Sequence, residues 1–256
     1  MKLSFVVPAY NEEARIAECV RSIKAELART PLEAEIIVVN NASTDRTAEV
    51  AGAIEGVRVV NEPHKGLPRA RQAGFVASSG ELIANIDADT IMPQGWIARV
   101  LKEFARDEKL VALTGPFIYY DLPILSRAIT RISYIIGYIG YFVNRFIVRG
   151  GSFLQGGNYV ARRDAIAKVG GYNTAIAFHG EDVDMAKRLF PLGHVKWTFA
   201  LPMYASGRRF AHEGVLKTEL QYGLSYLSVM LRGKQLTERY ADVRETGGTA
   251  VPPTTV

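Results

Sequence analysis

The feature that most constrains this chain is the alternation of short apolar runs and amphipathic segments along its first ninety residues. The apolar runs predict four buried strands, at Leu3–Val7, Ile36–Val39, Val57–Val60 and Leu82–Ile86. The segments between them carry apolar residues at helical spacing, which predicts one helix per connection. Strand–helix alternation with short connections builds a mainly parallel sheet with helices on both faces. The sequence therefore predicts an α/β fold.

Polar clusters follow three of these strands directly, at Tyr10–Glu12, Asn40–Asp45 and Asp87–Asp89. In sheets of this kind, ligands bind beyond the carboxyl ends of the strands. We therefore expect the three clusters to meet at one edge of the sheet and to form a single ligand site.

The helix starts are predicted from capping residues. Asn11 is the expected N-cap of a first helix that buries Ile16, Val20, Ile23 and Leu27. Ser43 or Thr44 is expected to cap a second helix that runs to about Ile54. A third helix is expected over Leu67–Ser79.

The second half of the chain is less regular. It predicts strands at Leu110–Tyr119 and His194–Ala200, and helices at Trp96–Phe104, Glu181–Leu192 and Val215–Leu231. We divide the chain into a ligand-binding half (1–120), an apolar helical insertion (121–149), a second half-site (150–237) and a flexible tail (238–256).

Composition excludes several classes of protein. Hydrophobic residues make up 48% and charged residues 22%, which is ordinary for a globular protein with a sizeable core. The net charge of +5 is scattered rather than gathered into a basic run, so no nucleic-acid partner is expected. The single cysteine, Cys19, lies at helical spacing among apolar neighbours and is expected to be buried.

The first apolar run ends at Pro8, too short for the core of a signal peptide, so a cytoplasmic location is expected. A second apolar stretch, Ile132–Val143, contains three tyrosines at helical spacing and has arginines on both sides. It is shorter than the ~20 residues that a spanning helix needs. Two alternatives stay open: a helix in the membrane interface, which would attach the protein to the inner face of the cell membrane, or a buried helix over the site.

Two acidic clusters are candidates for chemistry. Asp87 and Asp89 lie two residues apart after a strand, where both carboxylates can face one point and hold Mg²⁺ or Mn²⁺; the alternative is a solvated turn. Asp182 lies in the acidic run Glu181–Asp184, which can supply a general base; the alternative is the ordinary preference for acids in a first helical turn.

A resemblance to a known family rests on five motifs in series. They are Pro8-Ala-Tyr-Asn-Glu12, Asn41-Ala-Ser-Thr-Asp45, Ala70-Arg-Gln-Ala-Gly74, Asp87-Ala-Asp89 and Gly180-Glu-Asp182. Together they resemble the family 2 glycosyltransferases, which have the Rossmann-like GT-A fold. The resemblance implies a metal-dependent enzyme of the hexosyltransferase type that inverts the anomeric carbon. It would take a UDP-, GDP- or dTDP-linked sugar and pass the sugar to an acceptor hydroxyl, on a sugar or on a polyprenyl-phosphate-type lipid.

The same resemblance implies roles for individual positions. Asp182 matches the catalytic base and Asp89 the metal ligand. The donor-binding positions are Pro8, Ala9, Tyr10, Glu12, Asn41, Arg71 and Asp87, with Asn41 on the base and Arg71 near the diphosphate. The acceptor-side positions are Glu181, Asn158 and Arg162. Arg208, Arg209 and His212 are further candidates near the leaving group or the metal.

The chain departs from the family pattern at two of these motifs. Asn40-Asn-Ala-Ser43 stands where the family usually has Asp-Asp-Gly-Ser, and Gln72 stands where it usually has Asn. The chain has no Gln-x-x-Arg-Trp motif, which argues against a processive polymer synthase. Two rival functions remain: a nucleotidyltransferase, and a non-catalytic sugar-nucleotide- or lipid-binding protein of the same fold.

Overall fold

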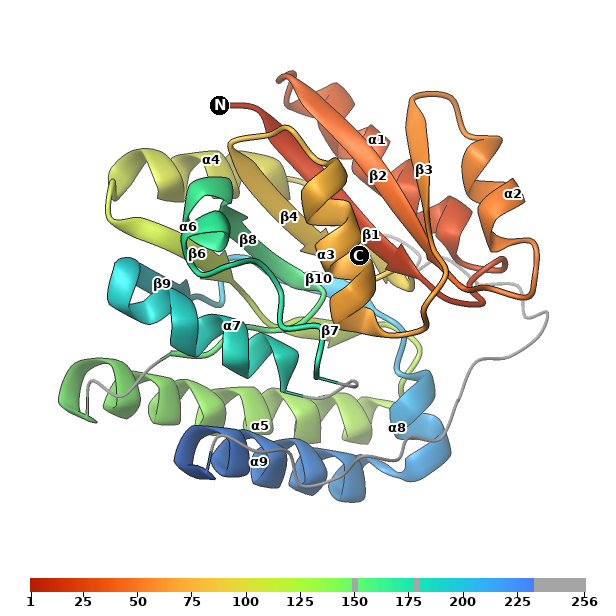
Figure 1. Cartoon of the computed structure of the whole chain (residues 1–256). Coiled ribbons are helices and arrows are strands. Elements are labelled where there is room, and N and C mark those ends of the chain that lie inside the picture. The colour runs from red at the N-terminus through yellow and green to blue at the C-terminus, as the bar shows by residue number, and fades with distance from the viewer. Residues whose placement is uncertain (149–151, 177–179, 233–256) are drawn as a thin grey trace.

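The computed structural model describes residues 1–148, 152–176 and 180–232, and the predicted tail 238–256 lies outside them. A seven-stranded sheet in the order β3-β2-β1-β4-β8-β6-β9 forms the centre (Figure 1). Its strands are β1 (Leu3–Ala9), β2 (Ala34–Asn41), β3 (Val57–Glu62), β4 (Leu82–Ile86), β6 (Leu110–Thr114), β8 (Asn158–Arg162) and β9 (His194–Trp197).

The predicted parallel half of the sheet is confirmed. β1 pairs in parallel with β2 and β4, and β2 pairs in parallel with β3. β8, by contrast, runs antiparallel between β4 and β6, with Asn158 opposite Ile86 and Arg162 opposite Leu82. The start of β8 therefore lies at the edge where β1, β2 and β4 end.

Helices cover both faces of the sheet, and all seven residues of β1 are buried between them. One face packs against α1 (Ile16–Arg29) and α4 (Trp96–Arg106), through a cluster that includes Phe5 and Val7. The other face packs against α3 (Leu67–Ala77), α6 (Arg163–Lys168) and α7 (Glu181–Leu189), through a cluster that includes Val6. This alternation along β1 is what a strand covered on both faces requires. Cys19 is buried, as predicted.

The predicted strand Leu110–Tyr119 is in fact two strands in two sheets. After β6, the chain leaves the central sheet at Gly115-Pro116 and forms β7 (Phe117–Tyr119). Proline has no N–H for a sheet ladder, and a Cβ on Gly115 would lie 2.0 Å from the carbonyl oxygen of Leu201. A small second sheet then joins β7, β10 (Met203–Ala205) and β5 (Thr90–Ile91).

Both predicted capping assignments are wrong. Helix α1 begins at Ile16, because Asn11 adopts a left-handed conformation (φ 52°) and its Oδ1 accepts a hydrogen bond from the Thr44 N–H at 2.8 Å. Helix α2 (Thr47–Gly52) begins after Asp45, whose Oδ1 accepts from the Thr47 N–H at 2.9 Å. The polar residues that looked like caps instead connect the two loops.

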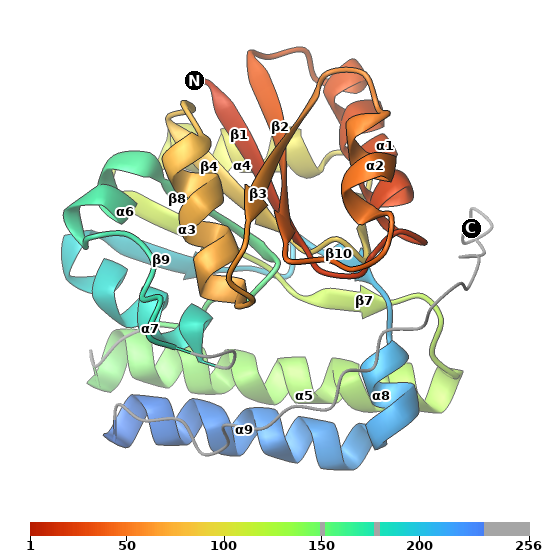
Figure 2. The same cartoon turned by 45° about the vertical axis from the view of Figure 1, so that its right-hand side comes forward.

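The apolar insertion is helix α5 (Ile124–Phe142), continued by a π-helical segment, η1 (Val143–Val148). After α8 (Arg208–Glu213), helix α9 (Val215–Arg232) lies beside α5, and the two form a separate layer at the base of the molecule (Figures 1 and 2). The predicted helix Glu181–Leu192 is α7 followed by the 3₁₀ turn η2 (Phe190–Leu192). None of the helices in the described ranges has the length and apolarity needed to span a bilayer.

Candidate active site

The predicted meeting of polar strand ends is confirmed. The loop after β1 is bound to the loop after β2, because the N–H of Asn11 donates to Ser43 Oγ at 3.1 Å. The N–H of Glu12 likewise donates to Thr47 Oγ1 at 2.8 Å. A helix start at Asn11 would have left these two N–H groups without intrahelical partners, and here the two side chains accept from them.

The donor motif lies at the end of β1. Pro8 and Ala9 are buried in the strand, and Tyr10 is the first residue with an accessible side chain. The ammonium of Lys65 lies 3.7 Å from the centroid of the Tyr10 ring, within cation–π range. Sequence reasoning missed Lys65, since an isolated lysine in a loop after a strand gives no signal of its own.

Asn41 has a different role from the base contact that the resemblance implies. Its side chain is buried, and its Nδ2 donates to the carbonyl oxygen of His64 at 2.8 Å. Its Oδ1 accepts from the N–H of Gly66 at 2.8 Å. The amide therefore holds the loop between β3 and α3. Gln72, the other departure from the family pattern, accepts from the Tyr172 N–H at 2.8 Å and fixes a turn on the other half of the chain.

Asp87 and Asp89 follow β4 in a turn that is held from two sides. The Asp87 N–H donates to the Gly157 carbonyl at 3.2 Å, and the Asp89 carbonyl accepts from the Ser206 N–H at 3.2 Å. Both carboxylates keep some exposure, 32% for Asp87 and 21% for Asp89. The turn thus presents two partly accessible carboxylates where segments from three parts of the chain meet.

Arg71 connects the two predicted acidic clusters. Its guanidinium is fully buried in α3; Nη2 lies 3.2 Å from Asp87 Oδ1, and Nη1 is ion-paired with Glu181 at the start of α7. The resemblance implies that Arg71 contacts the donor diphosphate. Its guanidinium is fully enclosed, however, and is not in a position to make that contact directly. It joins the donor-side and acceptor-side carboxylates instead.

Asp182 lies beside this cluster and is held by backbone groups. Its Oδ2 accepts from the Gly156 N–H at 3.1 Å, and its Oδ1 accepts from the Val183 N–H at 2.8 Å. A Cβ added to Gly156 would lie 3.2 Å from Asp182 Oδ2, and one added to Gly157 would lie 2.1 Å from Asp87. The carboxylates of Asp87 and Asp182 therefore approach two consecutive glycines, and only glycine fits at position 157, where φ is +78°.

Arg208 forms a second bridge on the other side of the Asp87–Asp89 turn. Its guanidinium lies 3.0 Å from Asp89 Oδ2 and binds the Glu12 carboxylate through both terminal nitrogens, with Nη1 donating to Oε2 at 3.0 Å. The structure thus brings Glu12, Asp89 and Arg208 together from opposite ends of the chain.

Burial shifts the ionisation of these groups. Burial raises the pKa of Glu181 to about 7, against the opposing effect of Arg71. Burial also raises the pKa values of Asp182 and Asp87. Burial would lower the pKa of each arginine, but the carboxylates outweigh it and raise the pKa values of Arg71 and Arg208. All three carboxyl groups therefore hold a proton more readily than ordinary carboxyl groups do.

Asn158 and Arg162 do not join this cluster in the way expected, whereas the roles of Arg209 and His212 stay predictions. Asn158 is fully buried; its amide donates to the Leu201 carbonyl at 2.9 Å and accepts from Trp96 Nε1 at 3.1 Å, so it holds backbone segments together. Arg162 lies at the opposite end of β8, where its Nε donates to the Leu110 carbonyl at 2.8 Å. Arg209 and His212 follow Arg208 on α8, and His212 is exposed.

The residues that could hold a divalent cation are Asp89 and Asp87. Carboxylate oxygens are the ligands that Mg²⁺ and Mn²⁺ prefer, and both side chains are partly accessible. In residues 1–148, 152–176 and 180–232 no group of three or more His, Cys, Asp or Glu side chains forms a protein-only metal site. The two carboxylates therefore fit a cation that takes its remaining ligands from a substrate or from water.

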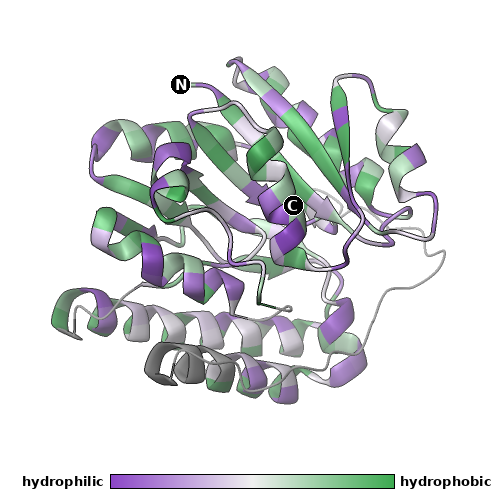
Figure 3. Cartoon of the chain, in the orientation of Figure 1, coloured by the Kyte–Doolittle hydropathy of each residue, from purple (hydrophilic) through white to green (hydrophobic). Residues whose placement is uncertain are grey.

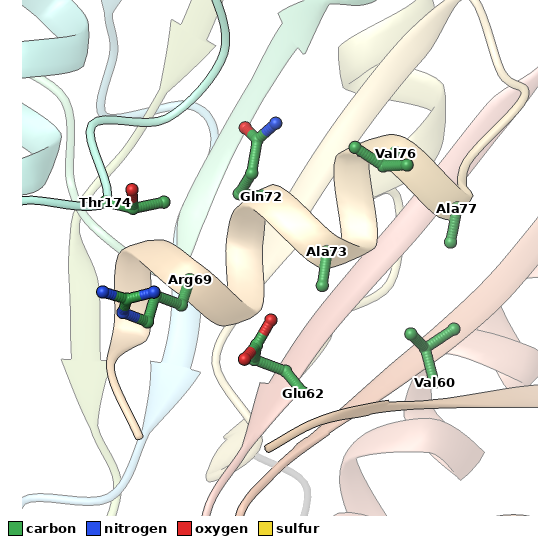
Figure 4. A pocket seen from close by; sticks show the side chains of 8 residues that line it. All are labelled: Val60, Glu62, Arg69, Gln72, Ala73, Val76, Ala77 and Thr174. Atoms are coloured by element: carbon green, nitrogen blue, oxygen red, sulfur yellow. The ribbon is translucent and has the colours of Figure 1, made fainter. Parts of the chain in front are cut away.

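A hollow of about 360 Å³ lies away from these carboxylates, between β3 and α3 (Figure 4). Its lining is Val60, Glu62, Arg69, Gln72, Ala73, Val76, Ala77 and Thr174. None of the predicted donor, metal or base residues is in this lining, so the hollow is separate from the candidate site.

Known structures share this fold. Glucosyl-3-phosphoglycerate synthase from Mycobacterium tuberculosis, solved in complex with Mn²⁺ and uridine-diphosphate-glucose, superposes with a TM-score of 0.58 at 21% sequence identity. The match covers 90% of this chain and 78% of that one. At this identity the likeness shows the GT-A fold alone.

Relatives in sequence are glycosyltransferases. The probable glycosyltransferase YdaM of Bacillus subtilis is 28% identical over 209 residues, covering 75% of this chain and 47% of the relative. The dolichyl-phosphate beta-glucosyltransferase ALG5D of Trichomonas vaginalis is 32% identical over 126 residues, covering 44% and 38% respectively. This chain thus spans less than half the length of either relative.

The family itself is shown by a match to the model of glycosyl transferase family 2, which extends over residues 4–170. That range includes four of the five motifs and the Gly156-Gly157 pair. The chain belongs to glycosyl transferase family 2.

Proposed function

We propose that the chain transfers a sugar from a nucleoside-diphosphate donor, UDP-, GDP- or dTDP-linked, to an acceptor hydroxyl with inversion of the anomeric carbon. The observation that supports this best is the Arg71 bridge, which holds donor-side Asp87 and the acidic start of α7 in one cluster. An inverting transferase needs its donor site and its general base side by side. This cluster holds a donor-side carboxylate, Asp87, next to the candidate base, Asp182.

Asp182 is the proposed base. It takes the proton of the acceptor hydroxyl as that oxygen attacks, and its raised pKa makes it a stronger base than an ordinary aspartate. The N–H groups of Gly156 and Val183 fix the orientation of its carboxylate. Glu181, paired with Arg71, holds the start of α7 in place.

Asp89, with Asp87 beside it, would hold the Mg²⁺ or Mn²⁺ ion. When bound, such an ion neutralises negative charge on a diphosphate leaving group. Two cations add positive charge on the proposed donor side of the site. Lys65 lies over the Tyr10 ring, and Arg208 lies beside Asp89. Tyr10 and Glu12, at the end of β1, complete the proposed donor side.

A lipid-linked acceptor, of the polyprenyl-phosphate type, is part of the proposal. Tyr134 on α5 donates its hydroxyl proton to Gln155 Oε1 at 3.2 Å, and Gln155 precedes the glycine that binds Asp182. The Asp182 carboxylate is therefore connected through Gly156 and Gln155 to helix α5, whose outer face is apolar. The Trichomonas relative is named for a dolichyl-phosphate substrate, which is chemistry of the same kind.

The rival functions have weaker support. For a nucleotidyltransferase we expect a glycine-rich, lysine-containing phosphate loop after the first strand. This chain has Pro8–Glu12 at that place. A non-catalytic binding protein would not need Asp89 and Asp182 together with a base tuned by burial.

Release of nucleoside diphosphate from a panel of sugar nucleotides, with and without Mn²⁺, tests the proposal. We expect Asp182→Asn to lower turnover by on the order of 10²–10⁴-fold, with Asp89→Ala causing a comparable loss. Asp184→Asn is the matched control, because Asp184 belongs to the same acidic run but is ion-paired with Arg188 at 2.8 Å. Wild-type turnover in Asp182→Asn would refute the proposed base.

A further inference from the structure

The outer face of α5 and η1 is apolar and exposed. Its side chains recur at intervals of three and four residues, so they form one stripe along the helix. Their exposed fractions run from 39% at Val143 to 79% at Ile124. The stripe consists of Ile124, Leu125, Ile132, Ile135, Ile136, Ile139, Phe142, Val143, Phe146 and Ile147, and we call it the α5 outer face.

The opposite face of α5 is the one that anchors the helix to the protein. Thr130 and Tyr141 are buried there, and the Tyr134 hydroxyl accepts a hydrogen bond from the Phe117 N–H at 3.1 Å. A surface helix normally turns its polar side to water, whereas most of the exposed side chains of α5 are apolar; Figure 3 colours the helix by the hydropathy of its residues. An exposed apolar stripe of this length marks an interaction surface.

Helix α9, the other helix of the base layer, also exposes apolar side chains. It lies beside α5, where Tyr222 packs in the same cluster as Tyr134. Leu216, Leu220 and Leu224 are exposed at four-residue intervals, by 73%, 64% and 47%.

The charges on α5 and η1 have one sign, whereas α9 carries both the exposed Lys217 and the partly buried Glu219. The segment Ile124–Val148 contains three arginines and no aspartate or glutamate. Two of those arginines, Arg127 and Arg131, are exposed, and Lys217 is exposed on α9. Apolar side chains with a cationic border are typical of helices that lie in the headgroup region of an anionic bilayer.

We propose that the α5 outer face, with the exposed leucines of α9, docks the protein on an anionic lipid surface. A second copy of the chain fits less well, because a two-fold interface would bring the same cationic borders against each other. The proposal goes beyond the transfer reaction and does not depend on it, since lipid binding is measured without a sugar donor.

Flotation of the full chain with vesicles tests the docking. We expect binding to vesicles of phosphatidylcholine with phosphatidylglycerol, and binding weaker by at least about tenfold to phosphatidylcholine alone or in high salt. Ile135→Glu with Ile139→Glu replaces two side chains of the α5 outer face and is expected to weaken binding by at least about tenfold. Arg127→Glu with Arg131→Glu should remove the preference for anionic lipid.

The matched control is Val76→Glu, which places the same charge on an apolar side chain that is 67% exposed on α3, away from the base layer. It should bind vesicles like wild type, and circular dichroism should show every variant folded. Failure of wild type to float with anionic vesicles would overturn the proposal. So would a wild-type dimer in sedimentation that Ile135→Glu with Ile139→Glu converts to monomer without any vesicle binding, because the face would then belong to a second copy.

Discussion

Two arginines bind the two aspartates of the Asp87-Ala-Asp89 turn, and their surroundings differ. Arg71 is fully buried and joins Asp87 to Glu181, whereas Arg208 is 16% exposed and joins Asp89 to Glu12. Each bridge spans distant segments, but only the Arg71 guanidinium is itself closed off from water, since both aspartates keep some exposure. The difference suggests a division of labour, in which the Arg71 cluster fixes the geometry of the site and the Arg208 cluster is able to rearrange when ligands bind.

The largest effect is expected at the buried bridge. Arg71→Met leaves the Glu181 carboxylate enclosed without its cation, and we expect a loss of about 3–5 kcal/mol in the free energy of unfolding. Urea denaturation measures this loss. The double variant Arg71→Met with Glu181→Leu removes the stranded charge and should recover much of the stability. A loss below about 1 kcal/mol in the single variant would mean that the buried bridge does not hold the site together.

An intermediate effect is expected from pH. The pKa of Glu181 is about 7 in the folded protein, against an ordinary value of 4.5. Between these values the folded state keeps a proton that the unfolded state has released, so this group's contribution to stability falls as pH rises from 4.5 to about 7. The stability difference between wild type and Glu181→Gln should therefore decline across this window by on the order of 1–3 kcal/mol.

Chemical denaturation at a series of pH values measures that difference. Using the difference cancels the other carboxyl groups, some of which have lowered pKa values and change stability in the opposite direction. Parallel pH profiles for the two proteins would show that the Arg71 cluster does not change its protonation in this range.

The smallest effect on stability is expected at the Arg208 bridge, whose guanidinium is 16% exposed. Arg208→Gln keeps a hydrogen-bond donor for the buried Glu12 but removes the cation beside Asp89, so the free energy of unfolding should fall by about 1–2 kcal/mol, less than for Arg71→Met. Mn²⁺ should bind about three- to tenfold more tightly, since the Asp89 carboxylate no longer has a competing positive charge. Calorimetric titration measures the affinity. Arg46→Gln is the control, from a surface pair with Glu13, and weaker Mn²⁺ binding in Arg208→Gln would remove the distinction between the two bridges.

The sequence predicted the parallel half of the fold well, because hydrophobic periodicity and short connections leave few alternatives. It also predicted that residues near positions 10, 41 and 87 meet, since all of them follow parallel strands. It did not predict the antiparallel β8, or that Asn41 and Asn158 hold backbone segments instead of facing a ligand. An asparagine looks the same in a sequence whether its amide is used inside the protein or outside, and only the geometry of its partners separates the two roles.

Arg71 and the glycine pair Gly156-Gly157 also show that a sequence does not reveal which groups a residue contacts. A family motif located Arg71 correctly but gave it a contact with the donor, whereas its burial makes it an internal bridge. The importance of Gly156-Gly157 appears only in the structure, where the carboxylates of Asp87 and Asp182 lie against the two glycines. Close approach of side chains to a backbone leaves no trace in sequence beyond the glycine itself.

Strands β7 and β8 hold both ends of the excursion that contains α5, one in each sheet. The helix therefore lies between two strands that the sheets hold in place, and its outer residues lie on the side opposite Tyr134, which contacts Phe117 and Gln155. The outer face of such a segment can change in sequence, and with it the surface that the protein binds, while the residues of the candidate site stay the same. Related enzymes could differ in where they work through this one excursion.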